Sequence, residues 1–189
     1  MNFESYQSAI RGLLGEKRYE HSVCVSRAAA QLARQYGADE EKAKTAGILH
    51  DIMKDLPREE QRKLMDRYGI RLTEVEQNAP KLWHAILGAE YIRRELGVKD
   101  PEILQAVRFH TTGREDMTLL DKVLFIADFI SEDRDYPGVE RLRETAKNSL
   151  EEAMIEGIVF TVKDLAEAKR PIHPDTIAAY NHTILQNQS

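Results

Sequence analysis

The sequence predicts an all-α fold, and three observations carry this prediction. Apolar side chains recur every three or four residues along nearly the whole chain of 189 residues, which is the spacing of one helical face. No stretch alternates apolar and polar residues over five positions strongly enough to favour a strand over a helix. Glycine, proline and asparagine gather in short segments between the periodic stretches, where they end helices and form turns.

The first expected helix covers residues 20–36. Apolar residues such as Val23 and Ala33 follow the helical spacing there, and Gly37 supplies a helix stop. Asp39 is a good N-cap for the next helix, because its carboxylate can accept hydrogen bonds from the free amides of a first turn.

That second helix reaches the pair His50 and Asp51 and must end soon after it. Pro57 follows, and the residue before a proline is pushed out of helical geometry. Pro57 is also well placed to begin a third helix, which Gly69 closes. The third and later expected helices cover residues 58–68, 82–96, 101–110, 118–131, 149–168 and 175–185.

Length and charge limit the class of protein. The length fits one domain, residues 1–189, in which extra helices follow a compact core. A net charge of −5 with scattered basic residues argues against binding long nucleic acid, although a small anion can still bind locally. No basic, apolar leader begins the chain, and no segment approaches the ~20 apolar residues of a membrane helix. We therefore expect a cytoplasmic protein without a membrane partner, and leave a homodimer open.

Four of the six histidines form an ordered series with two aspartates: His21, His50, Asp51, His84, His110 and Asp128. Imidazole nitrogen with carboxylate oxygen favours a divalent metal such as iron, manganese, cobalt or magnesium. A thiolate-rich zinc site is excluded because Cys24 is the one cysteine, which we expect to be a buried small hydrophobe. His50 and Asp51 would point ~100° apart on a regular helix, so we expect them at a helix end.

Each residue of the series also has a plainer interpretation. His21 or His84 alone is more often a partly buried histidine with a satisfied ring nitrogen than a ligand. Asp128 favours the metal, because it lies in the apolar run 123–130 and a buried carboxylate needs a cation or several donors. Asp121, two turns earlier, fits a functional role and a helix N-terminal acid equally well.

Four segments in the same order resemble the YqeK family of the HD superfamily of metal-dependent phosphohydrolases. They are residues 46–56 (AGILHDIMKDL), 110–113 (HTTG), 120–128 (LDKVLFIAD) and 172–176 (IHPDT), and the likeness spans roughly residues 18–181. The resemblance implies an all-helical HD-domain bundle with extra C-terminal helices. It also implies symmetrical cleavage of diadenosine tetraphosphate into two ADP, by attack of metal-bound water on a phosphoanhydride.

Position by position, the resemblance implies that His21, His50, Asp51 and Asp128 hold an iron ion. His84 and His110 match histidines that either bind a second metal or face the substrate phosphates. We favour phosphate contact, because few carboxylates are available to bridge two ions. Asp51, His84 and His110 are the expected catalytic residues, and Asp51 is expected to orient or deprotonate the attacking water.

A dinucleoside polyphosphate or an ADP-like nucleotide needs cations and hydrogen-bond donors around its phosphates. The expected substrate-binding residues are Arg18, Asp51, Lys54, His84, His110, Thr111, Asp128, Arg134, Arg170, His173 and Thr176. The plainer alternative for Arg18 and Lys54 is a solvated surface charge, and for residues 170–176 a rigid capped turn. Trp83 and Tyr91 fit the core better than a base-stacking role.

Two other functions stay open. One is a different HD-type nucleotide phosphatase or phosphodiesterase, which the released products would distinguish. The other is a nucleotide-sensing helical module without turnover, which would bind metal but hydrolyse nothing.

Overall fold

The computed structural model describes residues 3–186, which form eleven α-helices, one short 3-10 turn and no strand. Residues 1–2 and 187–189, which the single-domain prediction also includes, lie outside the described residues. The all-α prediction is confirmed. The elements are α1 Phe3–Leu13, α2 Glu16–Tyr36, α3 Glu40–Leu49, α4 Arg58–Tyr68, α5 Glu74–Asn78, η1 Pro80–Leu82, α6 Trp83–Arg94, α7 Pro101–Phe109, α8 Leu119–Ile130, α9 Val139–Asn148, α10 Leu150–Glu167 and α11 Pro174–Gln186.

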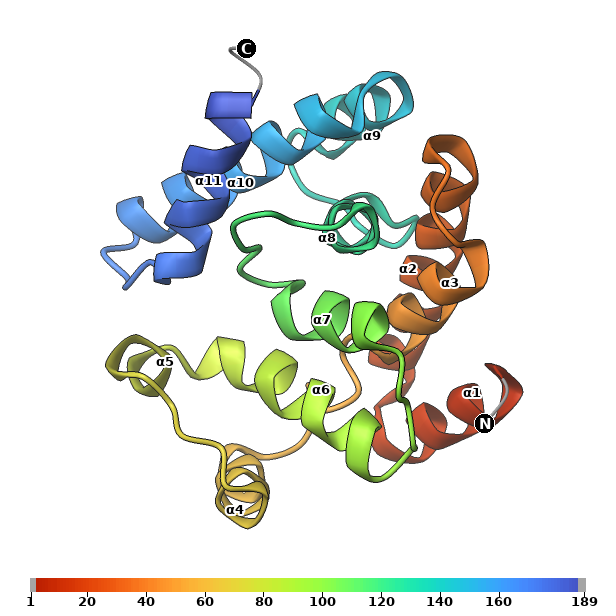
Figure 1. Ribbon diagram of the computed structural model, residues 1–189, viewed down its shortest axis with the longest axis vertical. Helices are drawn as coiled ribbons and strands as arrows, with labels where there is room; N and C mark the ends of the chain where they lie inside the picture. Colours follow the sequence, from red (N-terminus) through yellow and green to blue (C-terminus); the bar gives the residue numbers. More distant parts are fainter. Residues whose placement is uncertain (1–2, 187–189) are drawn as a thin grey trace.

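Helix α8 lies at the centre of the bundle (Figure 1), and α2, α3, α7, α9 and α10 all pack against it. Its side chains explain this position, because Val123, Leu124 and Ile126 have no exposed surface. The C-terminal helices continue from it: α10 packs on α8 and α9, and α11 packs on α10. No helix in the described part of the chain is both long and apolar enough to cross a membrane.

Helices α2 and α3 cross unusually closely at Gly47. A Cβ atom at this position would lie 2.6 Å from the Cα atom of Ser26 and 2.9 Å from its amide nitrogen. The Ser26 hydroxyl completes the contact by donating to the Lys44 carbonyl at 2.9 Å. This close crossing brings the middle of α2 beside the C-terminal end of α3, where His50 lies.

The helix-ending signals in the sequence are confirmed. Gly37 and Gly69 follow α2 and α4 with φ angles of 80° and 70°, a left-handed conformation that glycine adopts without steric cost. The Asp39 carboxylate accepts from the Lys42 amide at 2.9 Å and caps α3. The largest error in a predicted boundary is the start of α2, which begins at Glu16, four residues before the predicted position.

Three of the described helices lie outside the predicted set, namely α1, α5 and α9. α9 buries Val139, Leu142 and Ala146 at helical spacing, but each is separated from the next by polar residues. α5 has only five residues and is fixed by a capping box between Thr73 and Glu76. Such short helices are stabilised by tertiary packing, which local periodicity does not reveal.

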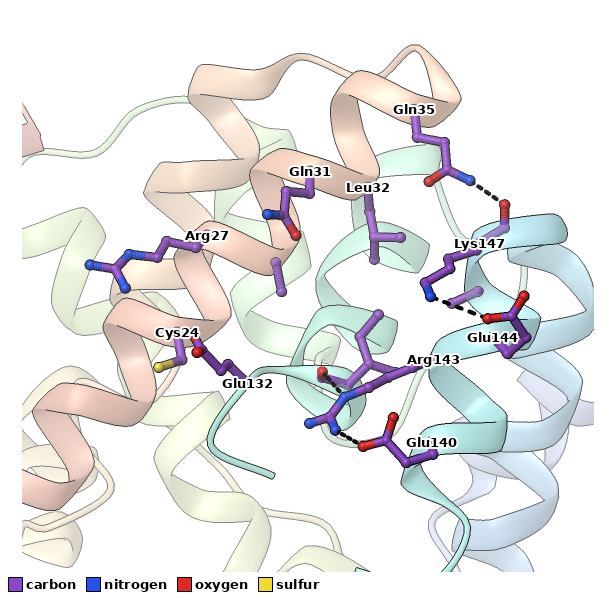
Figure 2. A pocket seen from close by; sticks show the side chains of 13 residues that line it. Cys24, Arg27, Gln31, Leu32, Gln35, Glu132, Glu140, Arg143, Glu144 and Lys147 are labelled. Carbon is purple, nitrogen blue, oxygen red and sulfur yellow. Dashed lines mark hydrogen bonds and ion pairs between the residues drawn. The ribbon is translucent and has the colours of Figure 1, made fainter. Parts of the chain in front are cut away.

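Cys24 corrects one expectation, because it is partly exposed rather than buried. It lines a surface pocket of about 510 Å³ between α2 and α9 (Figure 2). Partial burial raises the pKa of its thiol, so the thiol form is favoured and a reactive thiolate is not. Trp83 is a core residue as predicted, with its indole N–H donating to the Glu76 carbonyl at 2.7 Å.

Replacing Gly47 by alanine is expected to lower the free energy of unfolding by about 3 kcal/mol, because the added methyl collides with the backbone of α2. Urea unfolding followed by circular dichroism measures the change. The matched control is Gly12→Ala in α1, where a Cβ meets nothing within 4 Å and helix propensity predicts a gain of about 0.5–1 kcal/mol. Equal effects of the two substitutions would contradict the close crossing.

Candidate metal centre

Five helices deliver the six residues of the histidine and aspartate series to one place. His21 comes from α2, His50 and Asp51 from the end of α3, His84 from the first turn of α6, His110 from the end of α7, and Asp128 from the last turn of α8. His50 and Asp51 lie where α3 ends, as the sequence predicts, so their side chains can both face the centre. Residues up to 107 positions apart in sequence thereby meet.

The first group of ligand atoms joins two imidazoles with two carboxylates. The Asp128 Oδ1 atom lies 3.0 Å from His21 Nε2 and 3.9 Å from His50 Nε2. The Asp51 Oδ2 atom lies 3.5 Å from His50 Nε2 and 4.0 Å from His21 Nε2. The atoms of the predicted metal-binding set therefore converge.

The second group uses the other oxygen of Asp51. The Asp51 Oδ1 atom lies 3.0 Å from His84 Nε2 and 3.6 Å from His110 Nε2. The two imidazole nitrogens are 3.2 Å apart. Asp51 thus stands between two pairs of histidines and offers one oxygen to each pair.

Hydrogen bonds fix the orientation of three of the rings. The Nδ1 atom of His50 lies 2.7 Å from the Gly47 carbonyl, and that of His110 lies 2.8 Å from the Val107 carbonyl. The Nδ1 atom of His21 lies 2.8 Å from the Asp133 carboxylate. Because a carbonyl can only accept, Nδ1 of His50 and of His110 carries the proton, and Nε2 of each neutral ring keeps a free lone pair. Both ring nitrogens of His21 face carboxylates, Asp133 at Nδ1 and Asp128 at Nε2.

Two buried acceptors in this centre have no hydrogen-bond partner among the described residues: His50 Nε2 and Asp51 Oδ1. A buried polar atom without a partner costs free energy, and a cation removes that cost. The free Nε2 lone pairs and the carboxylate oxygens are also suitable donors for a divalent metal. The residues therefore fit a metal ion on structural grounds.

The pKa values agree with this chemistry. Burial lowers the pKa of His50 and that of His84 to about 4 each, so both rings are neutral at neutral pH. Burial also opposes ionisation of Asp51, but the neighbouring imidazoles of His50, His110 and His84 outweigh it and hold the Asp51 pKa well below its usual value. For Asp128, the same burial effect is outweighed by neighbouring imidazoles and a guanidinium. Neutral imidazoles and ionised carboxylates are the forms that bind metal.

Three partly exposed cations surround the carboxylates, as the sequence predicts. Arg18 Nη1 donates to Asp51 Oδ2 at 2.8 Å, and Lys54 Nζ lies 3.6 Å from Asp51 Oδ1. Arg134 Nε donates to the Asp128 carbonyl at 2.7 Å, and its Nη2 donates to the Asp128 carboxylate. Their side chains are 30%, 33% and 36% exposed respectively, so an anion arriving from solvent can reach them.

The other predicted substrate-binding residues line a separate pocket of about 300 Å³. It is lined by Thr111, Arg170, His173 and Thr176, together with residues of η1, α10 and the turn after α7. Thr111 of this pocket follows His110 of the metal centre directly in the chain. The Thr111 hydroxyl is buried and has no hydrogen-bond partner among the described residues.

His173 is held by protein on both ring nitrogens. Its Nδ1 atom accepts from the Asp175 amide at 3.1 Å, and its Nε2 atom lies 3.6 Å from the Glu76 carboxylate. The ring therefore forms part of the pocket wall, and a direct phosphate contact by His173 stays a prediction.

The sequence did not decide the role of Asp121 and did not point to Asp133. Asp121 caps α8: its carboxylate accepts from the Thr118 amide at 2.9 Å and from Arg114 at 2.7 Å, so the plainer interpretation holds. Asp133, which holds the His21 ring, was missed. Its only sequence signal is its place in the polar turn five residues after Asp128.

Comparison with known proteins agrees with this geometry. The model of the HD domain family matches residues 18–133, which include all six residues of the series. A protein of Halalkalibacterium halodurans named "Bis(5'-nucleosyl)-tetraphosphatase, symmetrical" is 41% identical over 100% of both chains. A Bacillus subtilis protein of the same name is also 41% identical, over 96% of this chain and 97% of its own. The crystal structure of a predicted HD superfamily hydrolase involved in NAD metabolism from Clostridium acetobutylicum superposes with a TM-score of 0.94, at 34% identity over 98% of both chains.

Stability of the metal-free protein should fall as the pH drops from about 6.5 to about 4. Histidines of the unfolded chain take up protons near 6.5, whereas folded His50 and His84 do so only near pH 4, so protons favour the unfolded state in this window. Urea unfolding in the presence of a chelator, at several pH values across the window, measures the slope. The His84→Gln variant should show a shallower slope, and a wild-type free energy that rises on acidification would contradict the assignment.

Proposed function

The chain belongs to the HD domain family, and on this basis we propose that it is a metal-dependent phosphohydrolase that cleaves diadenosine tetraphosphate symmetrically into two ADP. The observation that carries the substrate assignment is the length of the similarity to the symmetrical tetraphosphatases. It covers the whole chain, including the segment 170–176 that lines the pocket beside the metal centre.

His21, His50, Asp51 and Asp128 are the residues that would hold the metal. Two nitrogen and two oxygen donors without sulfur suit iron, manganese, cobalt or magnesium. We propose iron, because the resemblance to the YqeK family implies it. When bound, a divalent ion supplies Lewis acidity and lowers the pKa of a coordinated water.

His84 and His110 lie beside the Oδ1 atom of Asp51, opposite the first pair of histidines. Because Nδ1 of His110 donates to the Val107 carbonyl, the neutral ring presents a lone pair at Nε2 rather than a proton. That lone pair suits a second cation, or the proton of an attacking water, better than it suits a phosphate oxygen. The two oxygens of Asp51 also serve both histidine pairs, so the small number of carboxylates does not exclude a second ion. We therefore place the second-metal alternative ahead of direct phosphate contact for these two histidines.

Asp51 is the residue proposed to orient the attacking water. Its carboxylate is 3% exposed and ionised, and it lies within 3.6 Å of His84, His110 and Lys54 at one oxygen. A carboxylate fixed in this way can accept a hydrogen bond from water and hold it in line with a phosphorus atom.

Arg18, Lys54 and Arg134 are proposed to bind the polyphosphate. In the structure they pair with the ligand carboxylates, Arg18 with Asp51 and Arg134 with Asp128. Guanidinium groups bind phosphate oxygens in a two-point geometry, and all three cations lie at the solvent side of the centre.

The pocket of about 300 Å³ is proposed to hold one nucleoside of the substrate. Its apolar walls include Pro80, Leu82 and Leu165, which suit the faces of a base. The Thr111 hydroxyl, which is buried without a hydrogen-bond partner among the described residues, is proposed to bind a ribose or a first phosphate. Arg170 and Thr176 complete the expected contacts.

We also propose that the protein is cytoplasmic. That it forms one domain and that it forms a homodimer both stay predictions.

Two other functions would give different results with the same substrate. An HD-type phosphatase of another kind would release inorganic phosphate or a monophosphate, and a sensing module would bind metal without turnover.

Replacing Asp51 by asparagine should remove metal and activity together. The change keeps the shape of the side chain but removes the charge that both histidine pairs face, and we expect turnover to fall by about three orders of magnitude. Chromatography of the products from diadenosine tetraphosphate measures the rate, and elemental analysis measures the bound metal. The wild type should yield two equivalents of ADP, and the control Asp66→Asn on the exposed face of α4 should match it. Release of inorganic phosphate by the wild type would refute the substrate assignment.

Filling the nucleoside pocket should weaken substrate binding without loss of metal. Thr161 lies on α10 at the pocket wall, and Thr161→Trp is expected to raise KM about tenfold or more with kcat and metal content little changed. Asp164→Trp, on an exposed face of the same helix, is the control. An unchanged KM in Thr161→Trp would place the nucleoside elsewhere.

A further inference from the structure

The turn between α8 and α9 contacts the metal centre at two points. Arg134 binds Asp128, as described above, and Asp133 binds His21. The turn therefore reaches ligands from two different helices, α8 and α2. Asp133 has no role in the function proposed so far.

Both carboxylate oxygens of Asp133 accept hydrogen bonds that hold it in this position. Its Oδ2 atom accepts from His21 Nδ1 at 2.8 Å, and its Oδ1 atom accepts from the Ser131 hydroxyl at 2.8 Å. Ser131 has no exposed surface, so the carboxylate is anchored to the buried end of α8. Its hydrogen bond to His21 holds the ring with Nε2 directed at the Asp128 carboxylate, 3.0 Å away.

The partner of His21 differs in kind from the partners of the other oriented rings. His50 and His110 donate to neutral carbonyl groups of their own helices, whereas His21 donates to a charged carboxylate from another segment. A carboxylate partner makes an imidazole a more basic ligand and fixes its tautomer, and loss of such a partner commonly costs a factor of 10–100 in metal affinity.

Arg143 of α9 holds the turn from behind. Its Nε atom donates to the Ile130 carbonyl at 3.0 Å, and its Nη2 atom donates to the carbonyls of Ser131 and Arg134 at 2.7 and 2.9 Å. Figure 2 shows this guanidinium directed from α9 toward the turn, with Glu140 paired on its other side. A lysine could not reproduce this arrangement, because its single ammonium group lacks the planar fork of donors.

We propose that Asp133 is a positioning residue that orients His21 for metal binding, and that Arg143 holds the turn that carries Asp133. The proposal rests on the metal centre of the proposed function and not on its substrate. It assigns Asp133 no contact with the nucleotide.

The test measures metal affinity directly, in full-length protein stripped of metal and titrated with Co²⁺ by calorimetry. Asp133→Asn removes the charge and keeps the shape, and it should weaken Co²⁺ binding about 10- to 100-fold and alter the visible spectrum of bound Co²⁺. The control Asp135→Asn, two residues along the same turn and exposed, should bind within about twofold of the wild type. Wild-type affinity and spectrum in a folded Asp133→Asn variant would overturn the proposal.

Arg143 is tested by Arg143→Lys, with Arg141→Lys on the exposed face of α9 as its control. We expect Arg143→Lys to weaken Co²⁺ binding about tenfold and the double variant with Asp133→Asn to lose no more than Asp133→Asn alone. Fully additive losses would overturn the link between the two residues. Circular dichroism of the metal-free proteins reports whether each variant folds. If Asp133→Asn does not fold, Asp133→Ser, which also removes the carboxylate, takes its place: weakened Co²⁺ binding supports the proposal and wild-type affinity overturns it.

The outcomes also separate this inference from the proposed function. If the Co²⁺ affinity depends on Asp133 but the wild type does not split diadenosine tetraphosphate, the substrate is refuted and the positioning role stays intact. Normal symmetrical hydrolysis with Co²⁺ affinity independent of Asp133 would do the reverse.

Discussion

The buried carboxylate of Asp51 is the constraint on which the rest of this structure depends. It is 3% exposed, remains ionised, and faces two histidine pairs with its two oxygens. The Asp128 carboxylate lies against the same imidazoles, so negative charge is concentrated in the interior. Such an arrangement is stable only with compensating cations, which Arg18, Lys54 and Arg134 supply in the structure and a metal ion would supply in the working protein.

Two of the histidines around Asp51 are oriented in the same way, each by the end of its own helix. His50 and His110 both follow the last turn of a helix, and each donates from Nδ1 to the carbonyl three residues earlier. The last carbonyls of a helix lack partners within it, so one hydrogen bond satisfies the backbone and also fixes the ring. Nε2 then points away from its own helix toward the common centre. His21 lies inside α2, five residues after its start, where backbone carbonyls are bonded within the helix, and it takes the carboxylate of Asp133 as its partner.

Two different surfaces lie around the metal centre. The partly exposed cations Arg18, Lys54 and Arg134 lie beside its carboxylates, and a pocket with apolar walls includes Thr111, the residue after His110. That pocket needs α10 and the segment before α11, which lie beyond the residues 18–133 that match the HD domain. In the function proposed above, the common core would supply the metal chemistry, and the C-terminal helices would supply part of the wall of the nucleoside pocket.

The sequence by itself determined the helical class, most helix boundaries and the six histidines and aspartates that the structure brings together, because those depend on local signals: apolar spacing, the stops at Gly37 and Gly69, and rare histidines in series. It did not decide between a capping and a functional role for Asp121, nor did it reveal Asp133. Only the tertiary structure settled these, since Asp133 gains its role from a turn folded against a ring 112 residues earlier in the chain. It also decided which atoms of Asp51 face which histidines. These contacts between distant segments depend on how α2, α3 and α8 pack against one another. The sequence around a single residue does not show which other helix it will contact.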